Sequence, residues 1–128
     1  MRVITGKARG INLKTPEGLQ TRPTADRVKE ALFSIIQFDI PGARVLDLFG
    51  GTGQLGIEAL SRGAKSATFV DASNTACNLI RENLKRTRLQ EESRVICSDY
   101  LAFWAGARKN MILSFWIPLM LRIFWKTH

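Results

Sequence analysis

The 128-residue sequence predicts a single α/β domain with a Rossmann-like parallel sheet. Two observations lead to this fold class. Three short apolar segments rich in β-branched residues alternate with two longer segments of helical periodicity, and a glycine-rich turn joins the first apolar segment to the helix after it. Strands and helices that alternate at this spacing form right-handed βαβ units, in which the strands are parallel.

The first forty residues precede the expected sheet and divide into two parts. Residues 1–20 alternate short β-like runs with Gly and Pro, which predicts a basic hairpin outside the main sheet. Residues 21–40 predict a helix, with Thr24 as its N-cap and with Pro41 and Gly42 as its stop. The expected apolar face of this helix consists of Val28, Leu32, Ile35 and Ile36.

Residues 43–100 carry the expected βαβαβ core. Gly63 suits the left-handed position that ends the first helix of this core, and Ser73 suits the N-cap of the second. The second helix has one apolar face, which consists of Ala76, Leu79, Ile80 and Leu84. The predicted strands are 43–49, 66–72 and 93–100, and the predicted helices are 54–62 and 73–87.

Charge is distributed unevenly along the chain. The formal net charge is +8, and all 11 acidic residues lie at or before Asp99. A basic surface suits a nucleic-acid partner, although an ordinary solvated surface explains the charge of residues 1–99 equally well. Cys77 and Cys97 make no disulfide framework, so we expect buried, reduced thiols in a cytoplasmic protein. The N-terminus lacks the apolar segment of a signal peptide.

The glycine-rich turn carries the strongest chemical signal. Gly51, Gly53 and Gly56 spell G-x-G-x-x-G between a strand and a helix, the pattern of dinucleotide-binding turns. Asp47, just before this turn, would repel a pyrophosphate but would attract a cationic ligand. S-adenosylmethionine offers a sulfonium and an α-ammonium and has no phosphate. The turn therefore favours S-adenosylmethionine, with a nicotinamide cofactor as the alternative.

Two further acids end the next two expected strands. Asp71 ends the second strand, where a carboxylate can accept hydrogen bonds from both ribose hydroxyls. Asp99 ends the third strand, where it can accept a hydrogen bond from the adenine amino group. With Asp47, these acids lie at the carboxyl ends of consecutive parallel strands, the edge at which such sheets bind ligands. Singly, each acid is equally well explained by helix capping or by exposure to solvent.

Five segments of the sequence resemble the bacterial 16S rRNA guanine-N2 methyltransferases: MRVITGKARGINLKTP, TRPTADRVKEALFSII, VLDLFGGTGQLGIEALSRGA, FVDAS and VICSDY. The resemblance runs from Met1 to about Leu101, and its RPT-x-D-x-V-x-EALF block is more specific than the glycine turn. One departure is Gly50, where the family usually has Ala. The resemblance implies a class I S-adenosylmethionine-dependent methyltransferase fold with an N-terminal β-hairpin extension. It also implies methyl transfer to the exocyclic amine of a guanine in 16S rRNA.

The same resemblance implies site residues and partners. Arg22 and Thr24 would lie near the methionine end of the cofactor or near the target base, and Lys7 and Arg9 would contact RNA phosphates. The implied partner is 16S rRNA or a small-subunit assembly particle, bound by a cytoplasmic monomer that uses no metal and no membrane. The residues implied to bind S-adenosylmethionine are Thr24, Asp47, Phe49, Gly51, Gly53, Gly56, Asp71 and Asp99.

Residues 101–128 depart from the family. The family has an Asp/Asn-Pro-Pro-Tyr tetrapeptide that accepts hydrogen bonds from the target amine and packs on the base; this sequence has none, so no catalytic residue is assigned. When the tail is reverse-translated and read one frame over, Trp116-Ile117 must give Asp, and the next overlaps permit Pro-Pro-Tyr. This agreement predicts a frameshift between about Leu101 and Asn110, an aberrant apolar tail, a truncated domain and negligible methyl transfer.

Other interpretations stay open. Pro118 and Arg122 interrupt the apolar run 111–125, which is shorter than the roughly 20 residues of a membrane span. Its MILSFWI stretch has the composition of a further strand. Alternative functions are a non-catalytic RNA- or cofactor-binding module and an NAD-dependent oxidoreductase. The single histidine, His128, ends the sequence and gives no support to metal binding or to histidine general-base catalysis.

Overall fold

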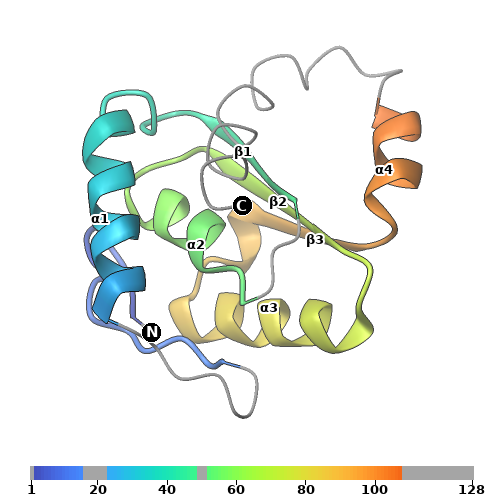
Figure 1. The fold of residues 1–128 in the computed structure, drawn as a ribbon, viewed down its shortest axis with the longest axis horizontal. Helices are drawn as coiled ribbons and strands as arrows, with labels where there is room; N and C mark the ends of the chain where they lie inside the picture. Colours follow the sequence, from blue (N-terminus) through green and yellow to red (C-terminus); the bar gives the residue numbers. More distant parts are fainter. Residues whose placement is uncertain (1, 16–22, 49–51, 108–128) are drawn as a thin grey trace.

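The computed structural model describes residues 2–15, 23–48 and 52–107, which are built around a three-stranded parallel sheet. Its strands are β1 (Arg44–Leu48), β2 (Ser66–Asp71) and β3 (Ser93–Cys97), and they lie side by side in this order (Figure 1). The register places Asp47 beside Phe69 and Asp71 beside Cys97. The parallel α/β sheet expected from the sequence is therefore confirmed.

The helices of the core cover the sheet. Helix α2 contacts β1 and β2, and helix α3 contacts β2 and β3. Right-handed crossovers between strands in the order β1-β2-β3 place both helices on the same face of the sheet. Helix α1 lies beside α2 at one end of the molecule, and α4 follows β3 at the other (Figure 1). The helices are α1 (Pro23–Ile36), α2 (Gln54–Ser61), α3 (Asn74–Thr87) and α4 (Tyr100–Ala107), with a short 3₁₀ turn at Gln90–Glu92.

The hydrophobic core lies between the sheet and the helices. Phe69 of β2 is fully buried on the face that α2 covers, where its ring lies under Gly56. Leu46, Ile57, Leu60 and Ile80 are fully buried members of the same hydrophobic cluster. Each such side chain stabilises the fold by about 1.5–3 kcal/mol relative to an exposed position. The two expected helix signals of this region are confirmed. The φ angle of Gly63 after α2 is +104°, and the Ser73 hydroxyl accepts a hydrogen bond from the backbone N–H of Ala76 at 3.2 Å.

Helix α1 differs from its sequence prediction at both ends. It begins at Pro23, so Thr24 lies within its first turn and is not its N-cap. Proline suits this position because its fixed φ matches the helix and it has no N–H to leave unpaired. The helix ends at Ile36, before Pro41 and Gly42. Its buried face also differs, because Phe33 is 1% exposed whereas Ile35 is 74% exposed.

The third strand is shorter than predicted. It ends at Cys97, and α4 begins at Tyr100, within residues that the sequence suggested as the end of a strand and the start of an apolar tail. Asp99 explains the change, because its Oδ1 accepts a hydrogen bond from the backbone N–H of Leu101 at 2.6 Å. A side-chain acceptor at this place favours the start of a helix over the continuation of a strand. Residues 108–128, which hold most of the predicted aberrant tail and the end of the interval predicted for the frame change, lie outside the described residues.

The N-terminal segment 2–15 is part of the core. Arg2 and Asn12 form an isolated antiparallel bridge, and the backbone N–H groups of Val3 and Gly10 donate to Ile11 and Val3 at 3.0 and 2.8 Å. The hairpin expected here is therefore reduced, within residues 2–15, to a single bridge without a longer ladder of paired strands. The buried side chains of the segment are Val3, Ala8 and Leu13.

Glu58 of α2 joins three parts of the fold. Its carboxylate lies 3.1 Å from Lys29 Nζ of α1 and 2.9 Å from Arg62 Nε, and both Glu58 and Lys29 are buried. It also accepts hydrogen bonds from the backbone N–H groups of Ile4 and Thr5, at 2.9 and 3.1 Å. Burial raises the pKa of Glu58, but the N–H of Ile4 and the two cations outweigh it, so the net pKa is lowered. Glu58 therefore stays ionised and binds the N-terminal segment to both helices.

Both cysteines are free, as expected, but they differ in exposure. Cys77 in the first turn of α3 is buried, in agreement with the prediction. Cys97 is exposed, which corrects the expectation of a buried thiol. Its position explains the difference, because Cys97 is the last residue of β3, which is an outer strand of the sheet in the part of the chain that the structure describes.

Candidate functional site

The carboxyl ends of the strands bring two of the predicted acids together. Asp47 lies one residue before the end of β1, and Asp71 is the last residue of the neighbouring strand β2. The negative charge of Asp71 contributes to a raised pKa at Asp47, so the two carboxylates interact. Asp99 follows β3 by two residues, on the side of α4. The edge predicted from the sequence is thus the edge that carries these acids.

Asp47 is buried beneath the start of α2. Its Oδ2 accepts a hydrogen bond from the backbone N–H of Gly56 at 3.1 Å. Burial raises the pKa of Asp47 to about 7; the Gly56 hydrogen bond opposes this rise, and the charge of Asp71 adds to it. A helix N-terminus ordinarily favours a negative charge, but here the loss of hydration is the stronger effect. A cationic ligand beside Asp47 would restore the preference for the ionised form.

The turn between β1 and α2 is fixed by an amide that sequence reasoning missed. Asn83 of α3 is buried, and its Nδ2 donates to the carbonyl oxygens of Thr52 and Lys14 at 2.9 and 3.0 Å. Its Oδ1 accepts from the backbone N–H of Lys14 at 2.7 Å. Asn83 therefore binds the turn to α3 and to the N-terminal segment. The signal in the sequence was an amide on the apolar face of a helix, beside Leu84.

Gly53 and Gly56 have different structural reasons for lacking a side chain. Gly53, before α2, has a φ of +78°, which favours glycine, and a Cβ there would lie 3.2 Å from Ile80 Cγ2. Gly56 lies inside α2, where a Cβ would overlap the ring of Phe69. The second and third glycines of the motif thus allow close packing of the turn and of α2 on the sheet.

Substitution of Gly56 by alanine tests this packing. We expect Gly56→Ala to lower the free energy of unfolding by about 1–3 kcal/mol, because the added methyl group must displace a buried ring. Denaturant unfolding of both chains measures this change. Phe69→Leu in the Gly56→Ala background should recover part of the loss, since the smaller side chain makes room for the methyl group. Simple additivity of the two substitutions would contradict this explanation.

Local hydrogen bonds fix Asp71 and Asp99. Asp71 is half-buried, and its Oδ1 accepts from the backbone N–H of Ser73 at 2.9 Å. Asp99 is exposed, and its backbone oxygen accepts from the N–H of Phe103 at 3.0 Å, in addition to the side-chain bond to Leu101. Asp99 therefore has the helix-capping role that the sequence left open as its alternative.

The remaining predicted site residues are placed only in part. Thr24 lies in the first turn of α1. Lys7 and Arg9 are exposed on the N-terminal segment, where Lys7 Nζ lies 3.7 Å from Glu92 Oε1. Both lie on a segment bound to α2, because the Lys7 N–H donates to the Ser61 carbonyl at 2.9 Å. The predicted site residues outside the described ranges are Arg22, Phe49 and Gly51.

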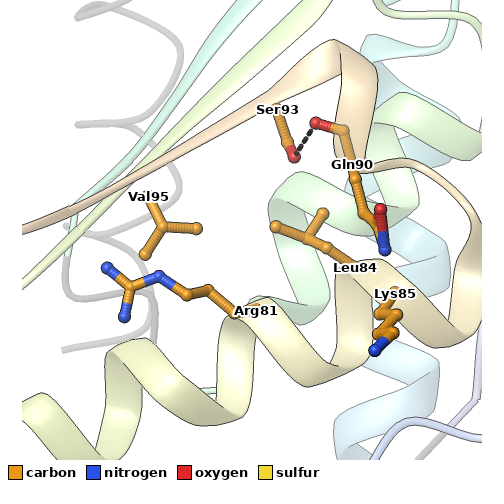
Figure 2. A pocket seen from close by; sticks show the side chains of 6 residues that line it. All are labelled: Arg81, Leu84, Lys85, Gln90, Ser93 and Val95. Atoms are coloured by element: carbon orange, nitrogen blue, oxygen red, sulfur yellow. Dashed lines mark hydrogen bonds between the residues drawn. The ribbon is translucent and has the colours of Figure 1, made fainter.

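An open hollow of about 440 Å³ lies elsewhere on the molecule, between α3 and β3 (Figure 2). Ser93, at the start of β3, lines it, so it faces the end of the strand opposite to the acids. In the described ranges, no three His, Cys, Asp or Glu side chains gather as metal ligands. Within those ranges, every helix is too short or too polar to cross a membrane. The hollow is lined by Arg81, Leu84, Lys85, Gln90, Ser93 and Val95.

Comparisons with known proteins agree with this architecture. The model of a family described as conserved hypothetical protein 95 matches residues 1–113. Ribosomal RNA small subunit methyltransferase D of Escherichia coli K12 is 39% identical over 114 residues, which are 88% of this chain and 57% of that protein. A Bacillus subtilis protein with the provisional name of an rRNA methyltransferase is 46% identical over 99 residues, which are 77% of this chain and 54% of that protein.

Solved structures share the fold. An Escherichia coli structure with the provisional name of a methyltransferase matches with a TM-score of 0.73 and 41% identity, over 82% of this chain and 56% of that one. The class I methyltransferase architecture expected from the sequence is thereby confirmed. The chain spans about half the length of the curated relatives that it matches.

Proposed function

The chain belongs to the family described as conserved hypothetical protein 95, and we propose that it forms the S-adenosylmethionine-binding part of an rRNA methyltransferase. The names of two relatives support the substrate class, since both are rRNA methyltransferases by name. The observation that carries the proposal is Asp47, a buried carboxylate with a raised pKa at the start of α2. Such a group is costly to keep without a cationic ligand.

The residues at the strand ends fit this cofactor. Asp47 would hold its cationic methionine end, Asp71 would accept from the ribose hydroxyls, and Asp99 would accept from the adenine amine. The cofactor supplies a methyl group on a positively charged sulfur. Gly53 has no side chain, so the cofactor could approach the backbone of the turn closely. The hydrogen bond from Asn83 to the Thr52 carbonyl holds this turn in place. The other proposed cofactor residues are Thr24, Phe49, Gly51 and Gly56.

The proposed acceptor is the exocyclic N2 amine of a guanine in 16S rRNA. The RNA or a small-subunit assembly particle would be bound in the cytoplasm by one copy of the protein. Lys7, Arg9 and Arg22 would contact phosphates, which position an RNA without reading its sequence. Each lost phosphate contact should weaken RNA binding and reduce its dependence on salt.

The 128 residues alone should bind the cofactor without efficient methyl transfer. The sequence contains no Asp/Asn-Pro-Pro-Tyr tetrapeptide to accept hydrogen bonds from the guanine amine. We expect calorimetric binding of S-adenosylmethionine in preference to NAD, with negligible incorporation of labelled methyl groups into unmodified small-subunit RNA. Preference for NAD would favour an oxidoreductase. Salt-sensitive RNA binding that survives loss of both Asp47 and Asp71, without cofactor binding, would favour a non-catalytic module.

The affinity for S-adenosylmethionine should depend on pH. Below pH 7, Asp47 is largely protonated in the unliganded protein, because its pKa is raised to about 7. A cationic ligand prefers the carboxylate, so we expect the affinity to rise through pH 7 and to level off above it. Binding near pH 7 should release protons, which calorimetry in buffers of different ionisation enthalpy measures. Asp47→Asn should remove the proton release, and an unchanged release would exclude Asp47 as its source.

A further inference from the structure

Both cysteine thiols contact the turn that carries Asp71. The Cys77 thiol, in the first turn of α3, donates to the backbone oxygen of Asp71 at 3.3 Å. The Cys97 thiol, at the end of β3, lies 3.1 Å from Asn74 Oδ1 and 3.8 Å from the backbone oxygen of Ala72. The two thiols therefore both contact the turn formed by residues 71–74.

The two thiols are also neighbours. Cys97 is the direct neighbour of Asp71 in the β2–β3 register, and Asp71 is the residue whose backbone oxygen binds Cys77 Sγ. Cys97 is among the causes that raise the pKa of Cys77, so the two side chains lie close together. Burial raises the pKa of Cys77 to about 11, with Cys97 and the charge of Asp71 as further causes. Cys77 is thus a protonated thiol at neutral pH, and the exposed Cys97 thiol lies beside it.

We propose that Cys77 and Cys97 are an oxidation-sensitive pair, and that their disulfide weakens the cofactor site by releasing the turn at 71–74. The oxidant is a small-molecule disulfide such as oxidised glutathione. The exposed Cys97 thiolate attacks one of its sulfur atoms, forms a mixed disulfide and releases one thiol. Cys77 then loses its proton and attacks Cys97 Sγ, which closes the protein disulfide and releases the second thiol. Two protein thiols are oxidised, and one small disulfide is reduced to two thiols.

The consequence follows from the hydrogen-bond donors. A disulfide has no S–H group, so the Asp71 carbonyl loses Cys77 as its donor. The single proton of Cys97, which Asn74 Oδ1 at 3.1 Å is better placed to accept than the Ala72 carbonyl at 3.8 Å, is lost as well. Asp71 lies at the start of this turn, and its carboxylate is oriented by the N–H of Ser73 within it. This part of the inference rests on the proposed function, because it assigns Asp71 to the ribose of the cofactor.

The covalent step is tested by mass spectrometry on the full 128-residue chain. The reduced protein is incubated with oxidised glutathione at pH 8, and we expect it to lose two hydrogens and to remain a monomer. Cys77→Ser should instead carry one glutathione on Cys97, because no second thiol can displace it. Cys97→Ser should remain unmodified, since Cys77 is buried. A parent chain that keeps glutathione on Cys97 would overturn the pair.

The effect on the site is tested by calorimetric titration with S-adenosylmethionine. We expect the oxidised chain to bind about tenfold more weakly, the effect of one or two lost hydrogen bonds, and dithiothreitol to restore the affinity. The Cys77→Ser/Cys97→Ser chain should not respond to oxidant. Equal affinity of the reduced and the oxidised chain would overturn the coupling to the cofactor site. If the reduced chain does not bind S-adenosylmethionine, the proposed function fails, and the mass measurement still decides the disulfide.

Discussion

Asp47→Asn is expected to abolish detectable binding of S-adenosylmethionine and, at the same time, to make the unliganded chain more stable. Asparagine keeps a side-chain oxygen that can accept from the Gly56 N–H, so the hydrogen bond at the start of α2 can persist. It removes the charge that burial and Asp71 disfavour. The same charge is what would attract the cationic end of the ligand. Stability and binding are therefore expected to change in opposite directions.

The sign of the stability change depends on pH. The pKa of Asp47 is raised from 3.8 to about 7 in the folded chain, so the folded state holds its proton more tightly than the unfolded state. The parent chain should therefore lose stability from Asp47 as pH rises from about 4 to 7. At pH 8, Asp47→Asn should be more stable by about 4 kcal/mol, because a rise in pKa from 3.8 to about 7 is worth about 1.4 kcal/mol for each unit. Near pH 4 the two chains should be alike.

Denaturant unfolding at pH 4, 6 and 8 measures this difference, and calorimetry measures the ligand. Asp39→Asn is the matched control, because Asp39 is an exposed acid in the turn after α1. We expect it to leave both the stability and the affinity nearly unchanged. An Asp47→Asn chain that binds S-adenosylmethionine like its parent would remove the central support for the proposed function.

Glu58→Gln should strongly destabilise the chain. The substitution leaves Lys29 buried without its carboxylate partner, and it removes the charge that Arg62 and two backbone N–H groups bind. Breaking one side of a buried ion pair costs about 3–5 kcal/mol. A loss of this size approaches the whole stability of many small domains. We expect a lower midpoint in urea, or a chain that is unfolded without denaturant.

A surface ion pair supplies the control for Glu58. Glu82 lies 3.2 Å from Lys14 Nζ, but both side chains are about half exposed, so Glu82→Gln should cost less than about 1 kcal/mol. The pKa of Glu58 is lowered on folding, so its contribution is complete above its unfolded pKa and is lost as pH falls through the folded pKa. The difference between parent and Glu58→Gln should therefore shrink in acid. Equal costs for Glu58→Gln and Glu82→Gln would contradict the role of the buried carboxylate.

The sequence predicted the features that depend on local pattern. The alternation of strands and helices, the left-handed Gly63 and the Ser73 cap all follow from neighbouring residues. The common edge of Asp47 and Asp71 followed from the parallel order of the strands.

The features that the sequence did not predict depend on distant contacts. Phe33 belongs to the buried face of α1, and the guanidinium carbon of Arg62 lies 4.7 Å from the centre of its ring. Glu58 and Asn83 were missed because each binds a segment more than fifty residues away, at Ile4 and Thr5 or at Lys14, and no periodicity records such contacts. The boundary at Asp99 was misplaced because a single side-chain hydrogen bond ended β3 and started α4.

The binding of the N-terminal segment to α2 and α3 also sets an order of folding. Ile4 binds a residue 54 positions later in the chain, and Lys14 binds one 69 positions later. Such nonlocal contacts are slow to form, because a long loop must close before they stabilise anything. During synthesis, Lys14 leaves the ribosome well before Asn83 and must wait for it before it can dock. Segment 2–15 is therefore among the last of the described parts to reach its native place, and until then Val3 and Leu13 stay exposed to solvent and to other chains.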